Sequence, residues 1–157
     1  MKYRQPIVFL FCLVWVFSAC KENTLYHSYQ SIKRTGWEKM DTISFHLPSR
    51  IPNGEYDMQI GIRFSERYPY QDIWLEVGHT NDSLIVSKDT LHLYLATEKG
   101  EWKGEGFGGL KQYTYIVSQP FTIQNSEGKM QFLINHLMSD SILKEIYDIG
   151  IQLVLKP

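Results

Sequence analysis

The sequence has 157 residues and a formal net charge of −1 at pH 7, which excludes the basic excess that a nucleic-acid-binding surface needs. Aromatic residues make up 14% of the chain, a content that favours β-strands because aromatic side chains pack well on pleated faces. The length suits one domain with a sizeable core. The chain contains no internal repeat and no low-complexity segment.

The N-terminal segment has the three parts of a bacterial signal peptide. Lys2 and Arg4 give a basic start, residues 7–17 are an unbroken apolar run, and Ser18-Ala19 supplies the small residues that precede a cleavage point. The apolar run has 11 residues, fewer than the roughly 17–25 that a membrane span takes. We therefore predict that residues 1–19 are removed as a signal peptide.

Cys20 follows the small residues directly, in the position of the acylated cysteine of a bacterial lipoprotein. Each buried acyl CH₂ adds about 0.8 kcal/mol of membrane affinity, so two or three chains such as palmitate give a stable anchor. The alternative is an ordinary secretory signal followed by an incidental cysteine. Lipidation would consume Cys20, and Cys12 lies in the signal peptide, so the mature domain would keep no thiol for a disulfide or a metal site.

Lys21 and Glu22 come directly after the predicted anchor. They resemble the lysine-plus-acidic signal that directs some bacterial lipoproteins to the cell surface, although a solvated linker explains them equally well. We predict that residues 20–30 are the lipidated N-terminus and a linker, and that residues 31–157 form the folded domain. The mature chain of 138 residues carries 14 basic and 17 acidic side chains, a formal charge of −3.

The rest of the chain alternates apolar and polar residues with a period of two, which predicts half-buried β-strands. The runs are Glu55–Phe64, Asp72–Val77, Thr90–Ala96, Tyr113–Val117, Phe121–Gln124, Lys129–Met138 and Tyr147–Leu155. Turn signals lie before and between these runs, at residues 52–54, 80–83, 98–100 and 126–128.

One segment departs from this pattern. In Ser139–Ile146, Asp140 is suited to cap a helix, and Leu143 and Ile146 are three residues apart, so we predict a short helix near the C-terminus. The fold class predicted from the whole chain is all-β: an antiparallel β-sandwich, jelly-roll-like, with this one short helix.

The sequence contains no local motif for catalysis or metal binding. Histidines occur singly, without the spacing of a local metal site, and the chain has no Gly-x-Ser-x-Gly elbow. The glycine run at residues 104–109 lacks the following helix of a phosphate loop, so it predicts a backbone bend between strands. We expect no enzyme activity, no metal and no cofactor; a hydrolase would need carboxylates or a His–Asp pair converging in a pocket.

Aromatic residues supply the candidate interaction surface. Trp74 lies between Ile73 and Leu75 and must point away from the apolar face of its strand. Together with Trp74, we select Tyr70, Trp102 and Phe107 as possible contact residues. Such residues serve as protein contacts, as a sugar-stacking platform or as part of the core.

Four sequence segments taken together resemble the GldH family of gliding-motility lipoproteins from Bacteroidota. They are Trp37–Asp41 leading to Phe45, Tyr68–Leu75, Gly100–Gly106 and Leu143–Ile151. The resemblance covers the mature chain and implies a non-enzymatic envelope lipoprotein linked to the gliding apparatus and its type IX secretion system. It supplies no catalytic residue, and because members also occur in non-gliding species it does not imply that this organism glides.

The predicted function is therefore a lipid-anchored envelope protein that acts by protein–protein interaction. Its predicted partners are the lipid membrane, through acylated Cys20, and other envelope proteins of the gliding or secretion apparatus. We expect it in the outer membrane, with the periplasmic and the cell-surface side both open. The alternative function is a glycan-binding surface lipoprotein, which an exposed row of Trp and Tyr on a concave face would favour.

Overall fold

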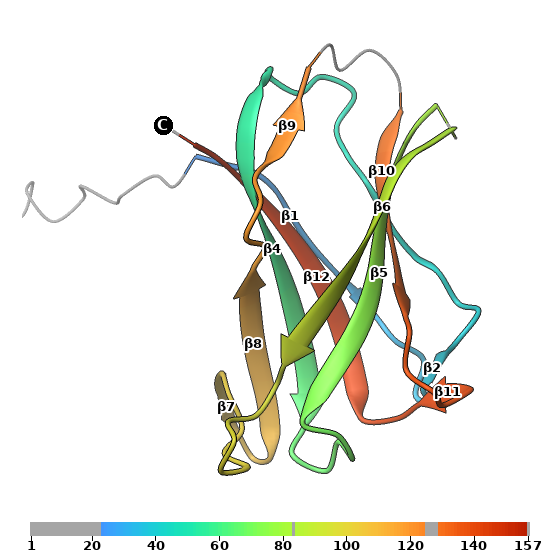
Figure 1. The fold of residues 1–157 in the computed structure, drawn as a ribbon, viewed down its shortest axis with the longest axis vertical. Coiled ribbons are helices and arrows are strands. Elements are labelled where there is room, and N and C mark those ends of the chain that lie inside the picture. The colour runs from blue at the N-terminus through green and yellow to red at the C-terminus, as the bar shows by residue number, and fades with distance from the viewer. Residues whose placement is uncertain (1–22, 83, 125–128, 157) are drawn as a thin grey trace, which may run out of the picture.

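The computed structural model describes residues 23–82, 84–124 and 129–156. All the regular secondary structure within these ranges is β-strand. All the strand pairings are antiparallel. The strands form two main sheets that lie on either side of one hydrophobic core (Figure 1). The predicted all-β antiparallel class is confirmed, and the arrangement fits a β-sandwich.

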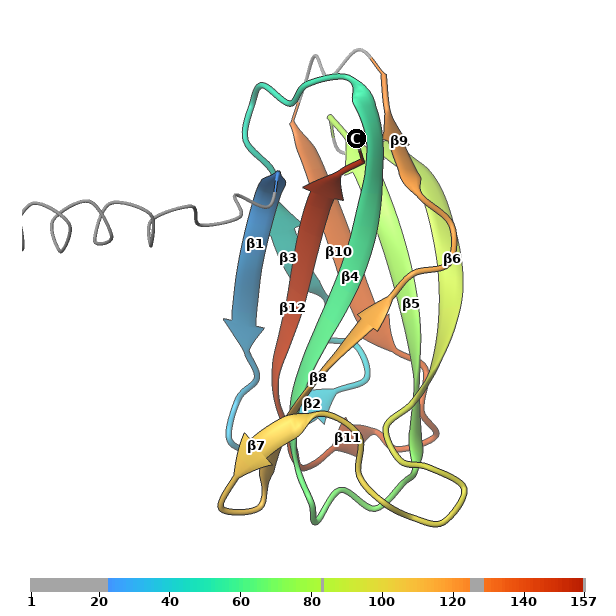
Figure 2. The ribbon, with the colours of Figure 1, turned by 90° about the vertical axis from the view of Figure 1, so that its left-hand side faces the viewer.

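The larger sheet, seen face-on in Figure 2, has six strands. Its main path runs β1 (Thr24–Ser31), β12 (Ile146–Leu155), β4 (Gly54–Ser65), β8 (Leu110–Ile116) and β7 (Glu105–Phe107), and β9 (Phe121–Ile123) pairs with the first residues of β4. The smaller sheet runs β3 (Ile43–His46), β10 (Met130–His136), β5 (Asp72–Asn81) and β6 (Leu84–Tyr94). A separate ribbon pairs β2 (Trp37–Glu38) with β11 (Ile142–Leu143).

The alternation of apolar and polar residues positions the core. On β4, the side chains of the apolar set are buried while Gln59 and Arg63, between them, face outward and are only partly covered. The same alternation on β12, β5 and β10 brings apolar side chains from both sheets into one cluster. Burying such side chains is the main favourable contribution to folding, so the alternating runs determine which face of each sheet turns inward.

The predicted helix over Ser139–Ile146 is wrong. Residues 142–143 form the short strand β11, which pairs with β2, and Glu145 has a φ of 65°, a left-handed conformation that a right-handed helix excludes. Asp140 does not cap a helix, because its carboxylate accepts a hydrogen bond from the Tyr70 hydroxyl at 2.9 Å. Burial of Leu143 and Ile146 in the core explains their apolar character.

The described part of the segment predicted as a linker, residues 20–30, includes a strand. Residues from Thr24 onward form β1, which pairs with β12 from Thr24 to Ser31, so the sheet begins seven residues before the predicted start of the domain at residue 31. The sequence of β1 is largely polar because this strand lies at the edge of the sheet and is only partly buried. It therefore lacks the strong apolar alternation that identifies the central strands.

The glycine run lies in the hairpin of β7 and β8, which fits the predicted backbone bend between strands. Gly108 and Gly109 connect β7 to β8 with φ values of 64° and 79°. Two consecutive positive φ values are typical of the tight turn that suits the twist of paired strands, and glycine adopts them without steric cost. Phe107 lies at the tip of this hairpin.

Candidate functional site

The predicted anchor Cys20 and the predicted export signal, Lys21 and Glu22, lie outside the described residues, as does the predicted signal peptide. In the described part of the chain, Thr24 begins β1 only four positions after Cys20. No helix within the described ranges is long and apolar enough to cross a membrane.

The predicted interaction residues other than Trp74 have different environments from one another. Tyr70 is half-buried, and its hydroxyl donates to the Asp140 carboxylate. Trp102 is also half-buried and packs edge-on against the core residue Phe64, with ring centroids 5.4 Å apart. Phe107 is 96% exposed at the hairpin tip. Tyr70 and Trp102 therefore contribute mainly to packing, and Phe107 projects into solvent.

Trp74 lies at the centre of an exposed aromatic surface on the outer face of the smaller sheet. Its indole stacks on His92, with centroids 3.9 Å apart and planes 10° apart, and His92 contacts Tyr94 at 4.4 Å. Trp74 is 40% exposed and Tyr94 56% exposed. We call Trp74, His92 and Tyr94 the aromatic patch. Leu137, 43% exposed, lies beside it and donates its backbone N–H to the Trp74 carbonyl at 2.8 Å.

Polar groups hold the aromatic patch in place. An Asp72 carboxylate oxygen lies 2.6 Å from Nε2 of His92 and so restrains the imidazole under the indole. The Lys103 ammonium lies 5.9 Å from the centroid of the Tyr94 ring, within the range of a cation–π contact. The patch thus combines apolar rings with charged neighbours, which is the usual composition of a protein-binding surface.

Sequence reasoning identified Trp74 but missed the other two members of the aromatic patch. His92 and Tyr94 alternate with Leu91 and Leu93, and this alternation places them on the face opposite the leucines. The missing information was the register, which sets His92 directly opposite Trp74 on the neighbouring strand. A register between strands depends on pairing that a single sequence does not reveal.

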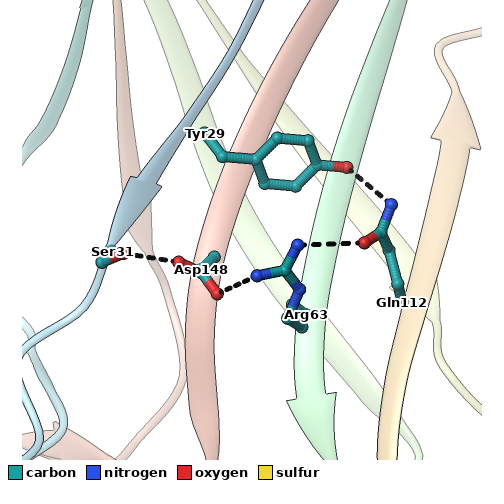
Figure 3. Close-up of polar contacts among 5 residues, drawn as sticks. All are labelled: Tyr29, Ser31, Arg63, Gln112 and Asp148. Carbon is teal, nitrogen blue, oxygen red and sulfur yellow. Dashed lines mark hydrogen bonds and ion pairs between the residues drawn. The ribbon is translucent and has the colours of Figure 1, made fainter. Parts of the chain in front are cut away.

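A polar cluster occupies the outer face of the larger sheet (Figure 3). Its members are Tyr29, Ser31, Arg63, Gln112 and Asp148. Arg63 contacts an Asp148 oxygen at 3.0 Å and donates to the Gln112 side-chain carbonyl at 3.2 Å. Ser31 donates to the other Asp148 oxygen at 2.6 Å, and the Gln112 amide donates to the Tyr29 hydroxyl at 3.4 Å. This cluster could not be predicted from the sequence, because its residues come from four separate strands.

The polar cluster is sheltered, which strengthens its contacts. Asp148 is only 9% exposed, so its hydrogen bonds from Ser31 and Arg63 replace the water that the carboxylate gives up. Burial raises the pKa of the Tyr29 phenol, while the nearby Arg63 charge acts in the opposite direction. Tyr29 therefore stays a neutral hydroxyl.

A cavity of about 180 Å³ opens beside β5 and β6 and contains a histidine–serine pair. Nδ1 of His79 lies 2.7 Å from the Ser87 hydroxyl, and burial lowers the pKa of His79. Asp89 also lines the cavity, but its carboxylate accepts the backbone N–H of Thr90 and does not bond to His79. The pair therefore lacks the carboxylate that would orient the imidazole as a general base.

Metal binding finds no support in the described ranges, where no group of three or more His, Cys, Asp or Glu side chains is arranged to hold an ion. His136 is buried, and its Nε2 bonds to the Trp37 carbonyl oxygen at 3.1 Å. His92 and His79 take part in the contacts described above.

Comparison with known proteins places the chain among lipoproteins. A family model described as GldH lipoprotein matches residues 24–153. The gliding motility lipoprotein GldH homolog of Christiangramia forsetii is 29% identical over 153 residues, which cover 93% of this chain and 92% of that protein. The gliding motility lipoprotein GldH of Flavobacterium johnsoniae is 23% identical over 163 residues, which cover 99% of each chain.

Solved structures give weaker similarity. The crystal structure of tomato aspermy virus aligns over 98% of this chain and 95% of the viral chain, with 12% identity and a TM-score of 0.40. A score of this size supports no inference about the present chain.

Proposed function

The chain belongs to the GldH lipoprotein family, and from this membership we propose a membrane-anchored envelope protein that acts by binding another envelope protein and not by catalysis. The family match carries the proposal, because it spans residues 24–153 and so includes strands β1 to β11 and most of β12. The names of the two relatives associate them with gliding motility. The proposed partner is accordingly a component of a gliding or type IX secretion apparatus.

The proposed anchor is a lipid on Cys20, held in the outer membrane. The signal-peptide pattern before Cys20 and the lipoprotein description of the family support this assignment. Lys21 and Glu22 are proposed to influence the side of the membrane on which the domain lies. Anchoring confines the protein to a plane and raises its effective concentration toward membrane-bound partners, so a modest contact surface is sufficient.

The proposed contact surface is the aromatic patch. Tryptophan and tyrosine are enriched among residues that dominate binding energy, and Trp74 and Tyr94 are both exposed. Asp72 and Lys103 lie beside the rings and supply charged groups at the rim. Because Asp72 restrains His92, the stacked rings lose little conformational freedom when a partner binds.

The proposed fold subclass is a jelly roll. Along the chain, β1, β4, β8 and β12 lie in the larger sheet, while β3, β5, β6 and β10 lie in the smaller one (Figure 1). The last strands lie between earlier ones, β12 between β1 and β4, and β10 between β3 and β5. This nested order of eight strands in two sheets supports the jelly-roll assignment.

Crosslinking in intact cell envelopes followed by affinity recovery of the full chain tests the proposed function. We expect the wild-type protein to recover a specific envelope protein, and Trp74→Ala to reduce recovery at least tenfold, because truncating an interface tryptophan typically costs about 2 kcal/mol or more. Phe107→Ala is the matched control, since Phe107 is an exposed aromatic residue outside the patch. Equal recovery by wild type and Trp74→Ala would exclude the patch, and recovery of no envelope protein would contradict the function.

A further inference from the structure

A row of four residues crosses the outer face of the larger sheet, and the two glycines among them leave a depression in that face. Tyr29, Gly150, Gly61 and Thr114 are directly opposite one another on β1, β12, β4 and β8. The Tyr29 ring extends from β1 across β12 toward β4 (Figure 3), and its atoms are the nearest neighbours of the space above both glycines. A β-carbon at Gly150 would lie 2.6 Å from Cε1 of Tyr29, and one at Gly61 would collide with the phenol. The two glycines therefore make the space in which the aromatic ring lies.

A shallow hollow of about 150 Å³ adjoins the Tyr29 ring. Its uncharged polar walls are formed by Gln59, Gln112, Thr114 and Gln152, and His27 lies at its edge. The amide of Gln152 donates to Thr24 at 3.2 Å, whereas the Gln59 side chain has no side-chain partner within the described part of the chain. Each glutamine amide provides both donors and an acceptor. The hollow thus offers hydrogen bonds of both kinds beside an aromatic ring.

Arg63 does not line the hollow, but its guanidinium carbon lies 5.7 Å from the centroid of the Tyr29 ring, and its charge is already balanced. Arg63 lies opposite Asp148 and Gln112 on the neighbouring strands, forms an ion pair with Asp148 at 3.0 Å and donates a hydrogen bond to Gln112 at 3.2 Å. Ser31 fixes the other oxygen of the same carboxylate. Because the Asp148 carboxylate neutralises the Arg63 guanidinium and holds it in place, the guanidinium does not attract a free anion. A phosphate or carboxylate ligand would need a positive charge in excess, which this pairing removes.

We propose that this hollow binds a neutral saccharide. The C–H face of a sugar ring packs against an aromatic ring, and its hydroxyls need donors and acceptors. The Gln59 amide supplies both, and the amides of Gln112 and Gln152 each keep one N–H beyond the bonds they already make. Tyr29 is the stacking residue, and Gln59 and Gln112 are the hydrogen-bonding residues. The site lies on the sheet opposite the aromatic patch and is independent of the protein partner proposed above.

The test is isothermal titration of the detergent-solubilised full chain with neutral hexasaccharides, namely cellohexaose, maltohexaose, mannohexaose, xylohexaose and chitohexaose, with inorganic phosphate as the charged comparator. We expect wild type to bind at least one hexasaccharide and not phosphate. Gln59→Ala should weaken that binding tenfold or more, and Tyr29→Ala should abolish it. Tyr29→Phe, which keeps the ring, should retain most of the binding and so distinguish lost stacking from misfolding.

Gln131→Ala is the matched control, because Gln131 is an equivalent amide on β10 of the other sheet. It should bind the hexasaccharide as wild type does. Absence of binding to every hexasaccharide would overturn the proposal, as would equal affinity in wild type and Gln59→Ala. Tighter binding of phosphate than of any saccharide would also overturn it. None of these results depends on recovery of a protein partner, so the two proposals fail separately.

Discussion

His136 is a titratable residue enclosed in the protein interior, with an exposed fraction of 1%. Its Nε2 bonds to the Trp37 carbonyl oxygen at 3.1 Å and must therefore donate a proton, while the buried Nδ1 has no hydrogen-bond partner in the described chain. The Trp37 indole packs edge-on against the imidazole, with centroids 5.2 Å apart. This environment suits the neutral ring and penalises the imidazolium.

The stability of the domain should consequently fall in mild acid. Burial lowers the pKa of His136 below 6.5; Lys39 acts in the same direction, while the Trp37 carbonyl and Asp140 oppose it. Below pH 6.5 the unfolded chain binds a proton that the folded chain rejects, so this contribution is present at neutral pH and is lost as the pH falls. The loss is at most about 1.4 kcal/mol for each pH unit.

Urea unfolding between pH 7.5 and 5 measures this effect. The His136→Phe variant, which cannot titrate, should show a shallower decline of unfolding free energy over the same range. His27→Phe serves as the control, because His27 is exposed on β1. An identical pH slope in wild type and His136→Phe would refute the assignment.

The orientation of a single side chain could be predicted where it depends only on the alternation of apolar and polar residues along a strand. The outward orientation of Trp74 followed from its place between Ile73 and Leu75, both of which are fully buried. Tyr70 and Trp102 are half-buried and stay predicted contact residues, because aromatic composition alone does not distinguish a half-buried side chain from an exposed one. Tyr29 and Gln59 were not selected at all, since their site depends on glycines in two other strands.

Elements differ in how strongly their sequences specify them. Strands β4, β10 and β12 carry long apolar alternation and were predicted to within one or two residues at each end, whereas β5 extends four residues beyond its predicted end at Val77. The short or marginal strands β1, β2, β3, β7 and β11 were missed, because they bury few side chains and depend on a neighbour for their hydrogen bonds. The false helix at residues 139–146 arose from the same weakness, since two buried residues three positions apart fit either a helix or an irregular strand.

Strand β6 exposes an apolar edge that should promote aggregation. It is the outer strand of the smaller sheet, and Leu84, Ile85 and Val86 are 74%, 60% and 59% exposed. An edge strand with free backbone groups and apolar side chains is a template for pairing with another chain. We predict that Ile85→Lys delays aggregation and changes the unfolding free energy by no more than about 0.5 kcal/mol.

Light scattering during slow heating measures this delay. Leu110→Lys is the control, because Leu110 is 37% exposed on β8 but is paired on both sides, with Ser65 of β4 and Phe107 of β7. It should leave the onset of scattering close to that of wild type. If both lysine variants delay aggregation equally, charge alone is responsible and the β6 edge has no special role.

At the scale of the whole molecule, the order of the strands in the sheets could not be predicted from the sequence. β12 lies between β1 and β4, although more than 100 residues separate Ser31 from its partner Asp148. Such distant pairing depends on how many apolar side chains the two sheets bury together, and no local sequence pattern indicates it. The all-β antiparallel class could be predicted from the alternation pattern, whereas both candidate surfaces required the assembled sheets.

The anchor proposal makes a prediction about the intact protein. Cys20→Ala should move the chain from the membrane fraction to the soluble fraction, because it removes the only proposed acylation site, while the unfolding free energy of the domain should stay unchanged. Cys12→Ala is the matched control, since it lies in the predicted signal peptide and should leave membrane attachment intact. Cell fractionation and urea unfolding provide the two measurements. Persistent tight membrane association of Cys20→Ala would contradict the proposal.

The position of β1 has a mechanical consequence for a protein tethered at its N-terminus. Thr24 pairs with Val154 at the end of the β1–β12 ladder, so a pull on the proposed lipid anchor at Cys20 would enter the domain through this edge strand. A force along the strand loads every hydrogen bond of the ladder in parallel. A force across it loads the terminal pair first and opens the others one after another. The domain should therefore resist a force parallel to its strands and unfold at a lower force perpendicular to them. In both cases β1 should be the first strand to detach.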